Sequence, residues 1–433
     1  MRARFVLLVL ALGLVAGPAG AVVTGAIYGP GSESFRIAVS PLKDLGGGGG
    51  LGAEFARALS RDLELSGYFK LIDPKTFVEN PETSGITADA IDFTGWAALG
   101  AQALVKGGVS AQGGGVTVEV RLFDVPGRKD VPQVGKRFTG GRADVPRMAH
   151  KTADAILAYL TGEPGPFDSE IAFVSNRGGR LKDVYLLTFD RDEPVRLTDE
   201  RSIVGAPEWR PDGRAILFRS YREHFPYLYE IDLASRQVRK LVPGTVPVLN
   251  GAWSPDGSRL LVTRDRGGDS NIDLLDRAGH LLRHVTDHWA IDVSPSWSPD
   301  GQHFVFCSSR TGSPQIYVSD VDGGPLRRLS ATGSYNTSPV WSPKGDHIAY
   351  TTRAGGAFQV VVVDADGADP HTITSAGSNE DPTWSPDGRY LIFSSTRAGR
   401  HHLVMADRDG RSQHELTRGA ADDTSPAWSP RRE

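Results

Sequence analysis

The stretch "SPSWSPDGQHFVFCSSR", residues 294–310, decides the fold of this chain. It places a Trp two residues before a Pro-Asp-Gly turn and follows the turn with an alternating apolar run. The same frame recurs along the second half of the chain, around Trp209, Trp253, Trp297, Trp341, Trp384 and Trp428. The spacings between these tryptophans are 44, 44, 44, 43 and 44 residues. A period this regular indicates a repeat architecture.

Each repeat predicts four short strands. The apolar run after the turn, for example Leu391 and Phe393, has the period of a half-buried strand, and two further strands follow after polar turns. Four strands in about 44 residues are typical of a β-propeller blade. The Pro-Asp-Gly turns are interpreted as structural, because Pro presets the turn and Gly accepts its positive φ. The tryptophans are interpreted as packing between neighbouring blades rather than as ligand-binding residues.

The two ends of the repeat region predict how the ring closes. Residues 170–198 carry the last three strands of a blade with no Trp hairpin before them, and residues 425–430 carry a Trp strand with no blade after it. Each end supplies what the other lacks. We therefore expect six blades, with the C-terminal strand completing the first blade and hiding two sheet edges.

The segment before the repeats alternates between strand and helix patterns. Leu51, Phe55, Leu59 and Leu63 share one face of a predicted helix, and residues 145–160 predict a second helix. The predicted fold is thus multi-domain, α/β plus all-β. It comprises a small α/β domain at 35–162, a linker at 163–167 and a six-bladed propeller at 168–433. The glycine run 46–50 lacks the Lys-Ser/Thr of a phosphate loop and is interpreted as a flexible loop.

The first 21 residues, "MRARFVLLVLALGLVAGPAGA", predict a secretory signal peptide cleaved after Ala21, with a membrane anchor as the alternative. The expected location is the periplasm, with residues 22–34 forming a mobile start. Cys307 is the single cysteine, so no internal disulfide is expected, and we interpret it as a core residue. The formal net charge of −4 argues against a nucleic-acid partner.

No motif of catalysis is present. The chain contains no Gly-x-Ser-x-Gly, no HExxH and no paired-Cys metal frame. We therefore expect a binding protein rather than an enzyme, with no catalytic residue and no firm cofactor. Two alternatives stay open, namely a periplasmic propeller hydrolase or lactonase that uses metal in its channel, and a small-ligand sensing module. Acidic residues gather ahead of the tryptophans, and the weak candidates for a calcium ion at the channel mouth are Asp292, Glu380 and Asp381.

The whole arrangement closely resembles the TolB family, the periplasmic components of the Tol-Pal envelope system of Gram-negative bacteria. The resemblance is carried by the signal peptide, the α/β domain, the "WSPDG" repeats and the closing "PAWSP". It implies a monomer that maintains outer-membrane integrity and outer-membrane invagination during cell division. The implied partners are Pal, the peptidoglycan-associated lipoprotein, then the inner-membrane protein TolA, and some colicins, with no insertion into the membrane.

The resemblance also implies which residues bind each partner. In the family the residues three to six positions before the repeated aromatic form the Pal surface, which lies at one mouth of the propeller channel. Here these positions include Leu249, Asn250, Val293, Ser294, Thr337, Ser338, Glu380 and Asp381. The start of the mature chain is implied to bind TolA through Val22, Val23, Thr24, Gly25, Ala26, Ile27 and Tyr28.

Overall fold

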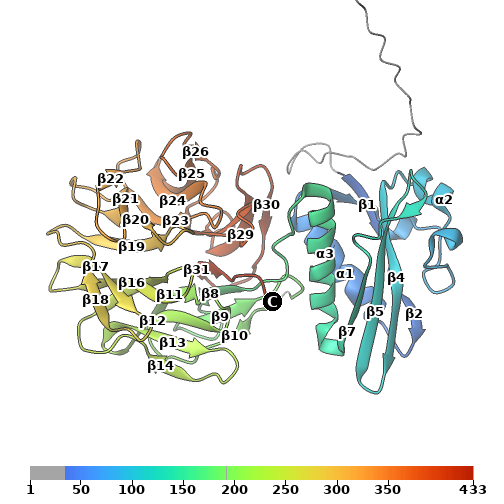
Figure 1. Cartoon of the computed structure of the whole chain (residues 1–433), viewed down its shortest axis with the longest axis horizontal. Coiled ribbons are helices and arrows are strands. Elements are labelled where there is room, and N and C mark those ends of the chain that lie inside the picture. The colour runs from blue at the N-terminus through green and yellow to red at the C-terminus, as the bar shows by residue number, and fades with distance from the viewer. Residues whose placement is uncertain (1–34, 192, 433) are drawn as a thin grey trace, which may run out of the picture.

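The computed structural model describes residues 35–191 and 193–432. The predicted signal peptide, the segment 22–34 and the implied TolA residues lie outside the described residues. Figure 1 shows two parts side by side, an α/β domain and a β-propeller. Within the described ranges, no helix is both long and apolar enough to cross a bilayer.

The α/β domain is built on one seven-stranded sheet. Its strand order is β3-β1-β4-β5-β6, with β2 paired to β4 and β7 paired to β5. The strands are β1 (Phe35–Val39), β2 (Lys43–Gly46), β3 (Phe69–Leu71), β4 (Ala103–Gln112), β5 (Gly115–Asp124), β6 (Lys129–Asp130) and β7 (Lys136–Gly141). The helices are α1 (Leu51–Leu65), α2 (Phe93–Ala98) and α3 (Val145–Thr161), with 3-10 turns at Pro74–Thr76, Ala88–Ala90 and Arg142–Asp144.

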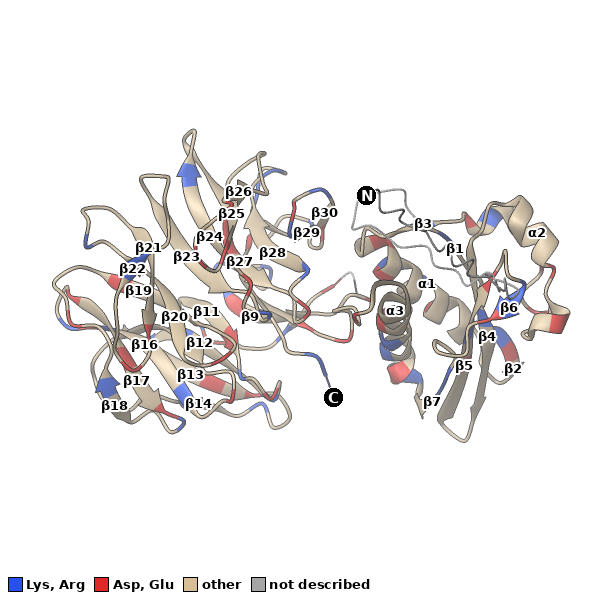
Figure 2. Cartoon of the chain, turned by 45° about the horizontal axis from the view of Figure 1, so that its top comes forward, with Lys and Arg blue, Asp and Glu red and all other residues tan. Residues whose placement is uncertain are grey.

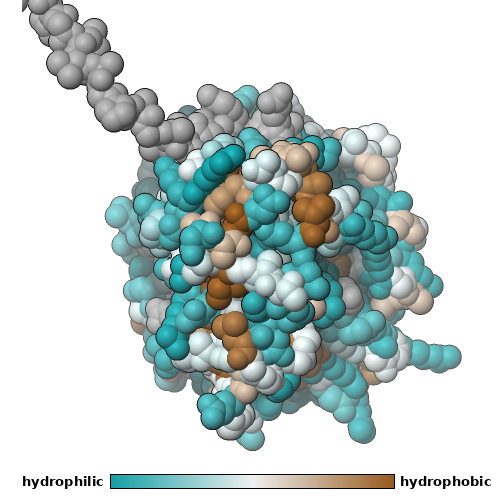
Figure 3. Space-filling view, turned by 90° about the vertical axis from the view of Figure 1, so that its right-hand side faces the viewer, coloured by the Kyte–Doolittle hydropathy of each residue, from teal (hydrophilic) through white to brown (hydrophobic). Residues whose placement is uncertain are grey.

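Helices α1 and α3 cover the side of this sheet that faces the propeller (Figure 1). Phe55, Leu59 and Leu63 of α1 are fully buried, as the predicted apolar face requires. Their hydrophobic cluster continues into the propeller through Phe173 and Ile392. The two domains therefore share one core at their junction. The end of the molecule formed by the α/β domain shows hydrophobic residues scattered among hydrophilic ones (Figure 3).

The glycine run forms a defined turn, so its interpretation as a flexible loop is corrected. The Asp44 carboxylate accepts hydrogen bonds from the backbone N–H groups of Gly46, Gly48 and Gly49, at 2.8, 2.9 and 3.1 Å. These bonds hold the pKa of Asp44 below its ordinary value. Just inside α1, a Cβ at Gly52 would lie 2.0 Å from the Leu42 carbonyl oxygen, so only glycine fits there.

The propeller has six four-stranded blades. Blade 1 contains β8 (Ile171–Ser175), β9 (Asp183–Leu187), β10 (Val195–Arg196) and β31 (Asp423–Trp428). Blade 2 contains β11 (Val204–Trp209), β12 (Ala215–Glu223), β13 (Phe225–Asp232) and β14 (Val238–Lys240). Blade 3 contains β15 (Val248–Trp253), β16 (Arg259–Asp265), β17 (Ser270–Asp276) and β18 (Leu281–His284).

The other three blades repeat this plan. Blade 4 contains β19 (Asp292–Trp297), β20 (His303–Ser308), β21 (Gln315–Asp320) and β22 (Arg327–Arg328). Blade 5 contains β23 (Asn336–Trp341), β24 (His347–Ala354), β25 (Ala357–Asp364) and β26 (His371–Thr372). Blade 6 contains β27 (Asn379–Trp384), β28 (Tyr390–Ser395), β29 (His402–Asp407) and β30 (Gln413–Glu415). Basic and acidic residues are interspersed over both domains (Figure 2).

Ring closure by the C-terminal strand is confirmed. Strand β31 pairs antiparallel with β8, placing Trp428 opposite Ile171. The indole N–H of Trp428 donates to the Ser169 hydroxyl at 2.8 Å. The Ala427 carbonyl accepts a hydrogen bond from the indole N–H of Trp209, the repeated tryptophan of blade 2, at 3.0 Å. The last strand of the chain thus holds blade 1 to blade 2.

The repeated tryptophans join neighbouring blades, as predicted. Trp297 donates its indole N–H to the Ala252 carbonyl of the preceding blade at 2.9 Å, and Trp384 donates to the Val340 carbonyl at 3.2 Å. Trp341 and Trp253 lack this contact. Trp341 is half-buried and its indole N–H donates to Gly345 in its own turn. The indole N–H of Trp253 has no partner among the described residues.

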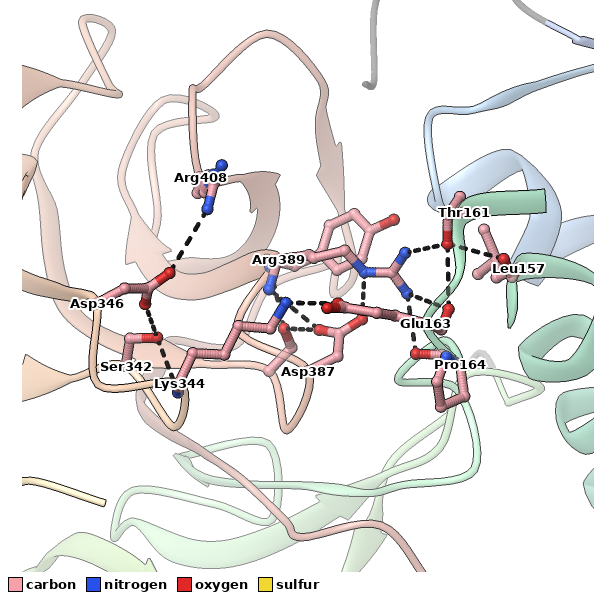
Figure 4. A network of polar contacts seen from close by, with 12 residues as sticks. Leu157, Thr161, Glu163, Pro164, Ser342, Lys344, Asp346, Asp387, Arg389 and Arg408 are labelled. Atoms are coloured by element: carbon pink, nitrogen blue, oxygen red, sulfur yellow. Dashed lines mark hydrogen bonds and ion pairs between the residues drawn. The ribbon is translucent and has the colours of Figure 1, made fainter. Parts of the chain in front are cut away.

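The α/β domain docks at the blade end that carries the Pro-x-Gly turns of blades 5 and 6 (Figure 4). The Arg389 guanidinium donates to the Thr161 hydroxyl at 3.0 Å and to the Pro164 carbonyl at 2.9 Å. The Tyr390 hydroxyl donates to the Ser66 carbonyl at 2.9 Å in a buried position. This end of the propeller is therefore engaged by its own chain.

A buried acid-base triad also crosses the junction. His150 of α3 contacts the Asp62 carboxylate of α1 at 2.6 Å and the Asp190 carboxylate of blade 1 at 3.1 Å. Burial alone would lower the pKa of His150, but the two carboxylates raise it to about 10. Burial likewise opposes ionisation of Asp190, yet its bond to His150 lowers the pKa to about 2.

The segment expected as a linker is packed rather than exposed over its second half. Gly165 and Phe167 are buried, and the backbone N–H groups of Phe167 and Asp168 donate to the Asp154 carboxylate at 2.9 and 3.1 Å. Burial raises the pKa of Asp154 to about 7 against these bonds. The connection is therefore part of the shared core.

Candidate functional site: the propeller tunnel and its mouth

The inner strands of the six blades surround a tunnel of about 800 Å³. Prolines line it at two levels, two residues before and two residues after the repeated Trp. The upper level holds Pro207, Pro295, Pro339, Pro382 and Pro426, and the lower level holds Pro255, Pro299, Pro343, Pro386 and Pro430. Because proline has no N–H, these residues blunt the inner sheet edges that face the tunnel.

The residue three positions before the Trp adopts a left-handed backbone in five blades. These residues are Ala206, Ser294, Ser338, Asp381 and Ser425, with φ between 47° and 55°. In each of these blades the pairing register of the inner strand shifts at this point, which marks a bulge. Positive φ is strained for residues other than glycine, so the bulge is a built feature of the mouth.

The bulge separates the predicted mouth residues into two groups. Asn250, Ser294, Ser338 and Asp381 line the tunnel. The residues one position earlier are half-buried and do not line it; they are Leu249, Val293, Thr337 and Glu380.

Hydrogen bonds join tunnel-lining residues of neighbouring blades at the mouth. Asn250 donates to the Ser294 hydroxyl at 3.3 Å. The Asp381 carboxylate accepts from the hydroxyls of Ser338 and Ser425, at 3.0 and 3.1 Å. Hydroxyl, amide and carboxylate groups thus connect the inner strands of neighbouring blades at the mouth.

Two of the acidic residues that stand ahead of the tryptophans, Asp292 and Asp423, do not face the mouth. Asp292 is fully buried and forms a two-point ion pair with Arg310, at 2.9 and 3.0 Å. Asp423 is equally buried and pairs with Arg177 at 2.6 Å. Each carboxylate points toward an arginine of its own blade, which neutralises it, and not into the mouth.

The candidate calcium ligands therefore do not converge. Asp292 is neutralised within blade 4, while Asp381 is held by two serines. Burial, with the neighbouring Asp381 charge, raises the pKa of Glu380. No cluster of three or more His, Cys, Asp or Glu side chains suited to a metal occurs in residues 35–191 and 193–432.

Sequence reasoning missed the arginines that support the mouth. Arg310 donates from Nε to the Ser308 hydroxyl at 2.7 Å, and its guanidinium lies over the Tyr317 ring, 5.1 Å from the centroid. Arg177 and Arg397 make the same contact with a serine two residues earlier. A recurring Ser-x-Arg after the second strand, matched with Asp or Asn five residues before the Trp, was the available signal.

Two charged tunnel residues were also missed, Glu208 and Arg219. Glu208 directly precedes Trp209, and burial raises its pKa to about 8. Arg219 of β12 reaches over Gly205 and donates to the Leu249 carbonyl at 3.1 Å. Neither residue recurs in the other blades, so the repeat pattern gave no indication of them.

Apolar side chains are exposed around the open mouth. In an antiparallel four-stranded blade, the loop entering the inner strand and the turn between the second and third strands share one end. The loops entering blades 2 to 5 and the β12–β13 turn carry Ile203, Phe225, Val246, Trp289, Ile291 and Tyr335, all exposed. Trp289 is the most exposed of them, at 72%. We call this set the apolar rim.

The chain matches two family descriptions. Residues 157–432 match "TolB beta propeller domain", and residues 25–131 match "TolB amino-terminal domain". The crystal structure of TolB from Acinetobacter baumannii superposes with a TM-score of 0.80 at 26% identity, covering 92% of this chain and 97% of that one.

Curated relatives named "Tol-Pal system protein TolB" are similar in sequence. The protein of Syntrophotalea carbinolica is 40% identical over 216 residues, covering 49% of each chain. That of Anaeromyxobacter dehalogenans is 39% identical over 244 residues, covering 56% of this chain and 55% of its own. The chain thus spans about half the length of the curated relatives it matches. With the propeller, its closure and its α/β domain in place, the chain belongs to the TolB family.

Proposed function

We propose that this chain is a non-enzymatic, periplasmic interaction component of the Tol-Pal system. Its open propeller mouth binds Pal, and its N-terminal segment, residues 22–34, binds TolA. The complex maintains outer-membrane integrity and supports outer-membrane invagination at division. Relatives that share the name of the system and the two family matches support this proposal.

The apolar rim is the observation that supports a Pal-binding site at the open mouth. Large exposed apolar side chains on one face favour a protein interface, because burying them removes apolar area from water. The opposite end of the propeller is engaged by the α/β domain through Arg389 and Tyr390. The open mouth is therefore the end available to a partner.

A surface-plasmon-resonance experiment with the soluble domain of Pal tests this proposal. Exchanging Trp289 and Ile291 together for serine should weaken binding by at least about tenfold, since aromatic anchors dominate interface energies. The matched control exchanges Leu281 and Leu282 for serine, because these residues are also exposed but lie on the outer strand β18.

Equal losses in both double variants, or no binding by the unmodified chain, would contradict the Pal site. The TolA part is tested separately with a chain lacking residues 22–32. This deletion should abolish TolA capture and leave Pal binding intact. Undiminished TolA capture would place that site elsewhere.

A further inference from the structure

At the junction of blades 2 and 3 the indole N–H of the repeated tryptophan lacks the contact that three other blades form. Trp209, Trp297 and Trp384 each donate the indole N–H to the carbonyl one residue before the preceding blade's Trp. The corresponding acceptor for Trp253 would be the Glu208 carbonyl. The buried indole N–H of Trp253 has no hydrogen-bond partner instead.

Further polar groups at this junction are also without partners. The Asn250 side-chain oxygen and Nε of Arg219 are buried and unbonded. No hydrogen bond or ion pair of the Glu208 carboxylate is found with any residue of the described ranges. All four side chains line the tunnel. One sector of the wall thus contains two buried N–H donors and one buried acceptor without partners, beside the half-buried Glu208 carboxylate.

Local sequence explains why this sector differs. Blade 3 has Gly251 where the other blades have proline, and a Cβ there would lie 2.9 Å from the Leu228 side chain. A Cβ at Gly205 would lie 2.7 Å from a terminal nitrogen of Arg219, so this glycine leaves room for the guanidinium. At the level of Glu208 the other blades carry small neutral side chains, namely Ala252, Ser296, Val340, Thr383 and Ala427.

The charges in the tunnel point to a ligand of both signs. Four charged residues line it within the described ranges, and three of them form hydrogen bonds with protein groups. Asp381 accepts two serine hydroxyls, Arg431 donates to backbone carbonyls, and one guanidinium nitrogen of Arg219 donates to a backbone carbonyl. Glu208 and Arg219 have no counter-charge among the described residues. Buried polar groups left unbonded cost free energy that a complementary ligand recovers.

We propose that this sector binds a short zwitterionic peptide, with its ammonium at Glu208 and its carboxylate at Arg219. Arg219 pairs with Gly205 and Leu217 pairs with Glu208 across the bulge, so on β12 the two charged residues are anchored two strand positions apart. That corresponds to about 7 Å of strand, which suits the termini of a dipeptide better than those of a single amino acid.

The proposal goes beyond the proposed function and does not rest on it. It also predicts a proton signature. Burial raises the pKa of Glu208 to about 8, so its carboxyl group in the free chain is mostly protonated at pH 7. An ammonium group favours the carboxylate, so peptide binding releases a proton.

Isothermal titration calorimetry of the full chain with diglycine at pH 7 tests the site. Binding is expected, with a measured enthalpy that depends on the buffer's ionisation enthalpy, as proton release requires. N-acetyl-diglycine and diglycine amide each lack one charge and should bind at least about tenfold more weakly. Glycine should also bind more weakly because it is too short. Absence of diglycine binding, or equal binding of the blocked peptides, would overturn the proposal.

Substitutions test whether the measured binding and proton release depend on Glu208 and Arg219. Glu208→Gln should weaken diglycine binding about tenfold and abolish proton release, and Arg219→Gln should weaken binding while keeping proton release. The matched controls are Glu119→Gln and Arg137→Gln, which change the same charges in an exposed pair 3.5 Å apart on the α/β domain. Melting temperatures check that each variant is folded. Retention of full affinity and proton release in folded Glu208→Gln would refute the assignment.

Discussion

Replacing Trp428 by alanine removes the side chain that fastens the last strand of the chain to blade 1. The indole is buried, packs against Phe189 with ring centroids 5.8 Å apart, and donates to the Ser169 hydroxyl. Trp341 occupies the same repeat position in blade 5. It is half-buried and its indole N–H donates only within its own turn, so it is the matched control.

The structure sets the expected magnitude. Truncation of a buried Trp costs about 3–5 kcal/mol, and the lost indole hydrogen bond adds about 1 kcal/mol. We therefore expect Trp428→Ala to lower the free energy of unfolding by about 4–5 kcal/mol. Trp341→Ala should cost about 2 kcal/mol, because much of that indole stays in contact with water in the folded state. A loss of 4 kcal/mol corresponds to a fall in Tm of roughly 10 °C.

Urea unfolding followed by circular dichroism, with Tm measured in parallel, compares the two variants. A third variant, Trp428→Phe, retains most of the apolar area and should recover more than half of the loss. Removal of residues 421–433 should be far more severe, because it also deprives Arg177 of Asp423 and Trp209 of its acceptor. The reasoning about ring closure fails if Trp428→Ala is no more destabilising than Trp341→Ala.

Two further predictions concern buried charges. Asp292→Ala should cost about 3 kcal/mol in urea unfolding, because it leaves Arg310 part-buried without its carboxylate. Asp292→Asn should cost about 1 kcal/mol, since Asn336 and Asn379 occupy this position in blades 5 and 6; equal costs would exclude the ion pair as the cause. The pKa of His150 is raised from 6.5 to about 10, so its stabilisation is complete below pH 6.5 and is lost as the pH rises toward 10. The Tm should therefore fall more steeply over this range in the unmodified chain than in His150→Gln, and parallel profiles would contradict the role of the triad.

The amino-acid sequence alone determined the propeller, its six blades and its closure. These features depend on local properties repeated along the chain, namely the Trp frame, the period-2 runs and the Pro-x-Gly turns. The unmatched half-blades at 170–198 and 425–430 left one way to complete the ring. The helices of the α/β domain followed from apolar spacing for the same reason. Short strands such as β2 and β6 were not predicted, because pairing partners distant in sequence define them.

Which side chains face the tunnel was decided by the tertiary structure. Side-chain alternation along a strand predicts direction only while the register is regular, and the left-handed bulge at Ser294 or Asp381 breaks it. The same limit applies to charge. Nothing in the sequence indicated a partner for Asp292, yet an arginine 18 residues later neutralises it. Glu208 showed no distinguishing feature in the sequence, yet its carboxyl group lies in the tunnel without an ion-pair partner among the described residues. Whether a carboxylate is paired depends on groups brought near it by folding, and spacing along the chain does not encode that distance.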